Sequence, residues 1–336
     1  MKNTYLVITS IASQEHPVLK EYASEALDQN IKFLVIGDTK SPTEFKIDGC
    51  AYYSVSDQIA LKFHLSKLLP FKHYARKNIG YLLALAQGAE IIIETDDDNL
   101  PMGDFWAERE LSINTRYTHS SGWTNAYKFF SDTNIWPRGF SLEHLQPSTE
   151  VKLFEKTPLI CPIQQGLADE NPDVDAIYRL TLPLPFNFEQ RESVALGNGA
   201  ICPFNSQNTT WFKEAFPLLY LPYYCNFRMT DIWRSFIAQR ILWTCDWHLL
   251  FHSSTVRQER NDHNLMHDFT DEISGYLNNT QIMEELIRLE LKPGPENITS
   301  NLRECYKMLI SKKFVGEDEM PLLEAWIADL TDISAL

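Results

Sequence analysis

Residues 75–99, ARKNIGYLLALAQGAEIIIETDDDN, decide the fold. From Arg76 to Gln87, apolar side chains stand at positions 79, 82, 83 and 86, which is the spacing of one face of an amphipathic helix. The run Glu90–Glu94 is short and apolar and predicts a buried strand, and polar residues follow it at once. A helix that leads directly into a buried strand is typical of the repeating unit of an α/β protein.

Two further apolar runs precede this unit. Thr4–Ser10 (TYLVITS) and Ile31–Asp38 (IKFLVIGD) predict buried strands, and Pro17–Asn30 between them predicts a helix. Because strands that alternate with helices pair in parallel through right-handed crossovers, we expect an α/β fold with a parallel sheet. Val194–Phe204 predicts another strand region, and Asp231–Trp243 predicts another amphipathic helix.

The composition narrows the functional class. Of the 336 residues, 44% are hydrophobic and 12% aromatic, which excludes intrinsic disorder as the main state. The 30 Lys and Arg against 45 Asp and Glu leave a net charge of −15, which suits neither nucleic acid nor an anionic membrane surface. No stretch has the ~18 apolar residues of a membrane span, and the six Cys form no C-x-x-C pair. Without a signal-peptide pattern, we expect a cytoplasmic protein with reduced thiols.

The character of the sequence changes after about residue 260. Stretches 281–292, 300–313 and 320–330 have helical apolar spacing, and Pro293-Gly294-Pro295 separates the first two. We therefore expect a main domain over residues 1–272 and a C-terminal helical appendage over residues 273–336.

The sharpest chemical feature is the triplet Asp96-Asp97-Asp98, directly after the predicted strand. Adjacent carboxylates repel one another unless a cation or solvent compensates, and ligands of open α/β sheets bind beyond the carboxyl ends of strands. Since side chains alternate along extended chain, Asp96 and Asp98 can point the same way and hold Mg²⁺ or Mn²⁺. The alternative is a solvated acidic turn in which Asp98 or Asn99 caps a helix.

Basic residues open the helix before the triplet. Arg76 and Lys77 at a helix N-terminus can bind an anion, although a plain surface pair is the alternative. A cation site and an anion site at one sheet edge suit a nucleotide diphosphate. Asp38 ends the second strand and can accept hydrogen bonds from a nucleobase or ribose, and Thr9, near the end of the first strand, is assigned to the same nucleotide site. The motifs of phosphate-loop NTPases, zinc proteases, α/β-hydrolases and dehydrogenases do not occur.

Residues 75–99 resemble the STELLO family of glycosyltransferase-like proteins, and more distantly the reversibly glycosylated polypeptide and UDP-arabinopyranose mutase family. Four further segments are similar in the same order, so that the resemblance covers about residues 75–272. These segments are QQGLADENPDVDAIYRLT (164–181), CPFNSQNTTWFKEAF (202–216), FRMTDIWRSFIAQRILW (227–243) and VRQERNDHNLMHDFTDE (256–272).

The resemblance implies a GT-A fold, in which a Rossmann-like sheet binds a nucleotide sugar with Mn²⁺ or Mg²⁺ at an Asp-x-Asp motif. By position, Asp96 and Asp98 are that motif, Asp97 lies beside the sugar, and Arg76 or Lys77 contacts the diphosphate. Asp231 sits where such folds carry an acceptor-side carboxylate, and it is either the general base or a plain helix cap. His263 is the first candidate for a late metal ligand and His252 the second, and a hydrogen-bonded structural histidine is the alternative. Asp173 and Asn205 are further candidates for binding sugar hydroxyls, or they only shape loops.

The predicted function is therefore a metal-dependent, inverting glycosyltransferase that moves a sugar from a nucleotide-diphosphate donor, UDP-linked by preference, to a glycan hydroxyl. Partner enzymes of glycan synthesis would bring it to the membrane periphery. One alternative is a sugar-nucleotide mutase, which needs the same donor site and no acceptor cleft. The other is a catalytically degenerate scaffold with a glycosyltransferase fold.

Overall fold

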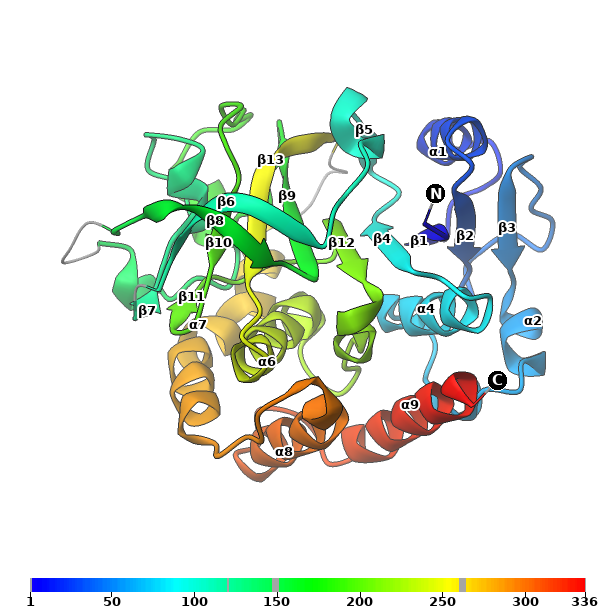
Figure 1. Cartoon of the computed structure of the whole chain (residues 1–336). Coiled ribbons are helices and arrows are strands. Elements are labelled where there is room, and N and C mark those ends of the chain that lie inside the picture. Colours follow the sequence, from blue (N-terminus) through cyan, green and yellow to red (C-terminus); the bar gives the residue numbers. More distant parts are fainter. Residues whose placement is uncertain (1, 120, 147–150, 260–263, 336) are drawn as a thin grey trace.

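The protein is built around one mixed β-sheet that runs through the molecule, with helices above and below it (Figure 1). The computed structural model describes residues 2–119, 121–146, 151–259 and 264–335. The strand order in this sheet is β3-β2-β1-β4-β12-β9-β13-β10-β6-β8, and β5 pairs with β13 beside this path.

The first half of the sheet is parallel. It contains β3 (Cys50–Tyr53), β2 (Lys32–Ile36), β1 (Thr4–Thr9) and β4 (Ile91–Thr95). Leu6 and Ile8 of β1 pack with α1 (Pro17–Asp28) on one face, whereas Tyr5 and Val7 pack with α4 (Lys77–Ala86) on the other. Strands covered on both faces need the continuous apolar runs that the sequence has here.

The second half is mixed and larger. β12 pairs antiparallel with both β4 and β9, while β9 and β13 pair in parallel. The strands of this half are β12 (Asn208–Phe212), β9 (Ile163–Asp169), β13 (Leu249–Gln258), β5 (Asn99–Pro101), β10 (Val194–Leu196), β6 (Ser112–Thr118) and β8 (Phe154–Ile160), and the separate pair β7 (Gly122–Trp123) and β11 (Ala200–Ile201) lies beside them.

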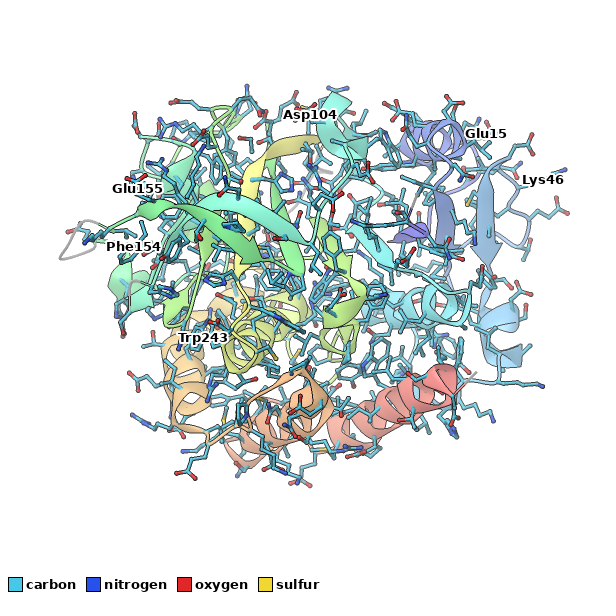
Figure 2. All side chains as sticks on the ribbon, viewed as in Figure 1. Glu15, Lys46, Asp104, Phe154, Glu155 and Trp243 are labelled. Carbon is cyan, nitrogen blue, oxygen red and sulfur yellow. The ribbon has the colours of Figure 1, made fainter. Side chains whose placement is uncertain are left out.

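Most of the remaining helices form a layer along one side of the sheet (Figure 1). The α-helices are α2 (Val55–Ala60), α3 (His64–Leu68), α5 (Ala176–Thr181), α6 (Thr230–Thr244), α7 (Leu265–Arg288), α8 (Ile298–Ser311) and α9 (Glu319–Ser334). The 3₁₀ turns are η1 (Tyr74–Arg76), η2 (Gly103–Trp106), η3 (Ala126–Phe129), η4 (Leu142–His144), η5 (Lys213–Leu219), η6 (Phe227–Met229) and η7 (Pro295–Asn297). Side chains fill the space between sheet and helices, whereas Phe154 and Glu155 project at the far edge (Figure 2).

The C-terminal helices are part of this layer. The boundary expected between residues 272 and 273 falls inside α7, which is one continuous helix from Leu265 to Arg288. Leu323 and Trp326 of α9 are buried in the same apolar cluster as α4 and α6, and Trp326 Nε1 donates to the Pro217 carbonyl oxygen at 3.1 Å. The helical region thus starts before residue 273 and shares the core of the sheet domain.

The α/β class is confirmed, and the parallel half is Rossmann-like, as the resemblance implied. The strands expected at Thr4–Ser10, Ile31–Asp38 and Glu90–Glu94 are β1, β2 and β4, because each is long enough and apolar enough to be recognised locally. Residues 194–204 hold two short strands, β10 and β11, separated by a turn with Gly199 at a positive φ. No helix in the described ranges is long and apolar enough to cross a membrane. The cytoplasmic location stays a prediction.

Candidate functional site

Three strands of the parallel half end at one place. β1 lies between β2 and β4 in the sheet. The chain passes from β1 to β2 on one side, and the later strand β4 pairs with β1 on the other side. Such a reversal of strand order opens a crevice at the carboxyl ends of the strands. The residues that follow these ends line it: Ser10 after β1, Gly37-Asp38 after β2, and Asp96–Asp98 after β4.

The crevice contains two adjoining cavities. The first, of about 290 Å³, lies over the ends of β1 and β2, and we call it the strand-end cavity. The second, of about 260 Å³, lies over the triplet, and we call it the acidic cavity. Four residues line both cavities, and we call them the neck: Thr9, Tyr74, Asp97 and Phe227. A ligand that occupies both cavities has to pass these four side chains.

Each carboxylate of the triplet has a different environment. Asp96 Oδ1 accepts a hydrogen bond from Lys77 Nζ at 2.8 Å, and Asp97 Oδ2 accepts one from Ser10 Oγ. Asp98 Oδ2 accepts from Gln258 Nε2 at 3.0 Å, whereas the buried Asp98 Oδ1 has no partner within the described part of the chain. Burial and the neighbouring carboxylates of Asp96 and Asp97 raise the pKa of Asp98 to about 7. Burial also raises the pKa of Asp96, against the effect of Lys77.

These observations show a site that is short of positive charge. A divalent cation would satisfy the unpartnered oxygen of Asp98 and would lower the pKa values of both acids. Among the residues that the structure describes, no three His, Cys, Asp or Glu side chains are arranged to hold a metal ion. One or two carboxylates are nevertheless what Mg²⁺ uses when phosphate and water supply its other ligands. Asp96 and Asp98 therefore fit a cation that is shared with a phosphorylated ligand.

The third predicted metal ligand, His263, lies outside the described residues. Its role in binding a metal stays a prediction.

The two predicted anion-binding cations are buried and bind protein oxygens, although Arg76 also lines the strand-end cavity. Lys77 is 0% exposed, and its ammonium group also donates to the Thr95 carbonyl oxygen at 2.9 Å. The buried guanidinium of Arg76 donates to Gln58 Oε1 at 2.9 Å through Nε and to the Leu69 carbonyl oxygen at 2.8 Å through Nη1. Because these donors are already engaged, the contacts do not favour direct binding of a diphosphate by either side chain. Lys77 instead offsets part of the negative charge of the triplet from the protein interior.

Asp38 and Thr9 lie where the nucleotide prediction needs them. Both line the strand-end cavity. Asp38 is only half-buried, and its carboxylate accepts from the backbone N–H of Thr39 at 2.6 Å and of His73 at 3.1 Å. These two bonds orient the carboxylate and connect the end of β2 to the turn that precedes α4. The contacts of Asp38 and Thr9 with a nucleotide stay predictions.

Asp231 lies at the acidic cavity, in the first turn of α6, but its environment does not suit a general base. Arg138 Nη2 lies 3.0 Å from Asp231 Oδ2, the Tyr74 hydroxyl donates to Oδ1 at 3.2 Å, and the Ser206 N–H donates to Oδ2 at 3.2 Å. Burial opposes the charged form, yet the guanidinium of Arg138 lowers the pKa of Asp231 to about 2. A carboxylate with such a low pKa and two occupied oxygens is a weak proton acceptor at neutral pH.

Sequence reasoning missed the residue that organises this side of the cavity. Arg138 also binds Asp173, with Nε 2.8 Å from Oδ1 and Nη2 2.9 Å from Oδ2, and Asn205 Nδ2 donates to the same carboxylate at 2.9 Å. Asp173 and Asn205 thus hold the buried Arg138. Arg138 stands in an irregular stretch, so no local spacing marks it, and the contacts that define its role are distant in sequence. Phe227 and Tyr74 of the neck were missed for the same reason.

Comparisons with known proteins agree with the resemblance. A family model described as STELLO glycosyltransferases matches residues 228–335, which extends the similarity over the C-terminal helices. "Probable glycosyltransferase STELLO2" of Arabidopsis thaliana is 28% identical over 325 residues, which cover 88% of this chain and 41% of that protein. "Probable glycosyltransferase STELLO1" of the same plant is 26% identical over 344 residues, which cover 92% of this chain and 43% of that protein. The STELLO resemblance is confirmed, and the chain spans less than half the length of these relatives.

Two solved structures are distantly similar. One is "Crystal structure of M. tuberculosis glucosyl-3-phosphoglycerate synthase", with a TM-score of 0.42 and 11% identity over 83% of this chain and 80% of that one. The other is "Crystal Structure of a Mycobacterial Protein", with a TM-score of 0.41 and 10% identity over 83% of this chain and 74% of that one. These scores are too low for the likeness to carry an argument about substrate or mechanism.

Proposed function

We propose that this chain is a metal-dependent glycosyltransferase that takes its sugar from a nucleotide-diphosphate donor, with UDP as the preferred nucleotide. The observation that carries the proposal is the pair of adjoining cavities at the ends of β1, β2 and β4. One of them is lined by the three carboxylates of the triplet and by Asp231, and Asp98 keeps a buried oxygen without a partner among the described residues. The similarity to proteins named as probable glycosyltransferases supports it.

The arrangement suggests how a donor would lie. The strand-end cavity, with Asp38 at its side, would take the nucleoside, and the acidic cavity would take the diphosphate and the sugar. Asp98, together with Oδ2 of Asp96, would hold Mn²⁺ or Mg²⁺, which supplies charge neutralisation for a leaving diphosphate. Asp97 lies in the neck and would accept a hydrogen bond from a sugar hydroxyl of the donor.

The residues around the acidic cavity also bear on the acceptor. Asp231 would shape this side of the cavity as a fixed anion, held by Arg138 and Tyr74, rather than remove a proton. The inverting displacement expected above relied on Asp231 as the base, and it loses its support with that role. The proposal therefore includes transfer to a hydroxyl of a glycan acceptor but does not include the anomeric outcome.

The test is release of the free nucleoside diphosphate. The full chain would be incubated with UDP-, GDP-, CDP- and dTDP-sugars in Mn²⁺, with and without glycan acceptors, and the nucleotide and sugar products would be separated. We expect release with one nucleotide class, its loss on addition of a chelator, and its loss in Asp98→Asn. The matched control is Asp104→Asn, an exposed aspartate at the periphery of the molecule (Figure 2).

Each outcome selects one of the three functions. Release of nucleotide that leaves a sugar-acceptor product supports the transferase. An isomerised nucleotide sugar with no release identifies a mutase and contradicts the transferase. No turnover of any donor, with biological activity retained in Asp98→Asn, identifies a scaffold with a glycosyltransferase fold.

A further inference from the structure

We propose that the C-terminal helices support the crevice that would bind the donor. Glu319 of α9 is the positioning residue that fixes the aromatic residues of the neck, Phe227 and Tyr74. This inference rests on the proposed function, because it assumes that a donor occupies both cavities. It assigns a role to helices whose role the sequence left open.

Glu319 is 0% exposed and binds a segment far from it in sequence. Its Oε2 accepts from the backbone N–H of Tyr223 at 2.9 Å and of Tyr224 at 2.6 Å, and its Oε1 accepts from the Tyr220 hydroxyl. The Gly316 N–H donates to the Tyr224 carbonyl oxygen at 2.8 Å, which adds a second link from the turn before α9. The start of α9 therefore holds residues 220–224 through the backbone of Tyr223 and Tyr224 and through the hydroxyl of Tyr220.

The same segment is also bound by α4. Asn78 accepts from the Leu221 N–H at 2.9 Å and donates to the Leu221 carbonyl oxygen at 2.8 Å. Asn78 is the residue after Lys77, which holds Asp96. Residues 220–224 are thus clamped between the helix that supports the acidic triplet and the first turn of α9.

The clamped segment leads directly to the neck. Tyr223 lies against His73, with 4.9 Å between ring centroids, and His73 in turn lies 4.9 Å from the ring of Phe227. Phe227 also packs edge-on against Tyr74, at 4.8 Å and 76°. Phe227 is nevertheless 51% exposed, and its free surface lines both cavities.

An exposed ring and a carboxylate that line the same neck have a clear ligand preference. Asp97 and Thr9 are the polar residues of the neck, and Phe227 and Tyr74 are its aromatic residues. A sugar ring presents hydroxyl groups at its edge and C–H groups on its face, so it suits both kinds of residue. The neck would hold the ribose of the donor against Phe227, because it joins the cavity for the nucleoside to the cavity for the diphosphate.

The chain offers a matched control on the same helix. Asp329 of α9 is also buried, at 2% exposed, and its carboxylate also accepts two backbone N–H groups, from His64 at 2.6 Å and Leu65 at 2.9 Å. Those residues start α3, and neither lines a cavity of the crevice. Asp329→Asn therefore disturbs the same kind of contact on the same helix without touching the segment that leads to Phe227.

The experiment compares Glu319→Gln, Asp329→Asn and Phe227→Ala in the full chain. The dissociation constant of UDP-glucose with Mn²⁺ would be measured by calorimetry well below the unfolding temperature of each variant. Coupling through a packed segment changes affinity by about 2- to 30-fold, and we expect a loss in this range for Glu319→Gln and Phe227→Ala. We expect Asp329→Asn to match the unmodified protein even where it unfolds at a lower temperature. Adding Glu319→Gln to the Phe227→Ala protein should change the dissociation constant little further, because both substitutions act on the aromatic residues of the neck.

Amide hydrogen exchange gives a readout that needs no donor. Glu319→Gln should speed exchange at residues 223–231, and Asp329→Asn should speed it only near residues 64–68. Unchanged exchange at 223–231, equal affinity losses for the two α9 variants, or additive effects of Glu319→Gln and Phe227→Ala would each overturn the inference. If the unmodified protein binds no nucleotide sugar, the proposed function fails, and hydrogen exchange alone still decides whether Glu319 positions the segment.

Discussion

The ammonium group of Lys77 lies 2.8 Å from Asp96 Oδ1, on a lysine side chain that is 0% exposed while the aspartate side chain is 38% exposed. The cation is thus inside the protein, and the anion faces the crevice. This arrangement places the ammonium group on the protein side of the acidic triplet and leaves the other oxygen of Asp96 on the side of the crevice. It also explains why the basic start of α4 matters even though the donors of Arg76 and Lys77 bind protein oxygens rather than a ligand.

Replacing Lys77 by Met should destabilise the fold. The substitution keeps the length of the side chain but leaves Asp96 and the Thr95 carbonyl oxygen without their buried donor. Losing one partner of a largely buried pair costs about 2–4 kcal/mol. Urea unfolding at pH 7 would measure the loss, with Lys67→Met on the exposed side of α3 as control. A loss equal to that of the control would show that the pair is not stabilising.

Asp231→Asn should lower the stability of the fold, whereas it should lower the rate of transfer only slightly. The substitution removes the charge that faces Arg138 but keeps an acceptor oxygen at the site. Removing a general base typically lowers the rate by 10²- to 10⁴-fold, whereas we expect a decrease within about tenfold. The rate of transfer and its pH profile would be measured beside urea unfolding. Loss of the acidic limb of the pH profile together with a decrease of more than about a hundredfold would restore Asp231 as the base.

The stability of the fold should depend on pH through Glu319. Burial raises the pKa of Glu319 to about 7, against the effect of its hydrogen bonds, from an ordinary value of 4.5. Between these values the folded state holds a proton that the unfolded state has released, so the free energy of unfolding falls as the pH rises from 4.5 to 7. Each unit of pKa difference corresponds to about 1.4 kcal/mol.

Glu319→Gln cannot titrate, so the difference in unfolding free energy between it and the unmodified protein should change with pH in this window. Urea unfolding at pH 5, 6, 7 and 8 would test this. A constant difference would mean that Glu319 is ionised throughout.

Gly80 should be needed for the close approach of α4 to the sheet. A Cβ atom at Gly80 would lie 2.5 Å from Val7 Cγ1 and 2.9 Å from Ile36 Cγ1. We expect Gly80→Ala to cost about 1–3 kcal/mol through overpacking, although Ala favours the helix by about 1 kcal/mol. Gly103→Ala is the control, since no atom lies within 4 Å of a Cβ there. A stabilised Gly80→Ala protein would show that α4 can move away from the sheet without a loss of stability.

The sequence predicted the parts of this molecule that depend on neighbours in the chain. β1, β2, α4 and β4 follow from apolar periodicity, and the triplet lies at the sheet edge because it follows a buried strand. The role of Arg138 depends on Asp173 and Asp231, and that of Glu319 on residues 220–224, all distant in sequence. The helix start with Arg76 and Lys77 was recognised, but both cations are buried and bind protein oxygens. Burial is a tertiary property that periodicity does not report.

The most direct test of the account is equilibrium binding of nucleotide sugars to the full chain, with and without Mn²⁺, in the unmodified protein and in Asp98→Asn. Thermal unfolding is a sufficient readout, since a ligand at about 100 times its Kd adds about 2.7 kcal/mol to the folded state. We expect stabilisation by one nucleotide class, only in the presence of Mn²⁺, and loss of that stabilisation in Asp98→Asn. Binding that is unchanged without metal or in Asp98→Asn, or no binding of any nucleotide sugar, would contradict it.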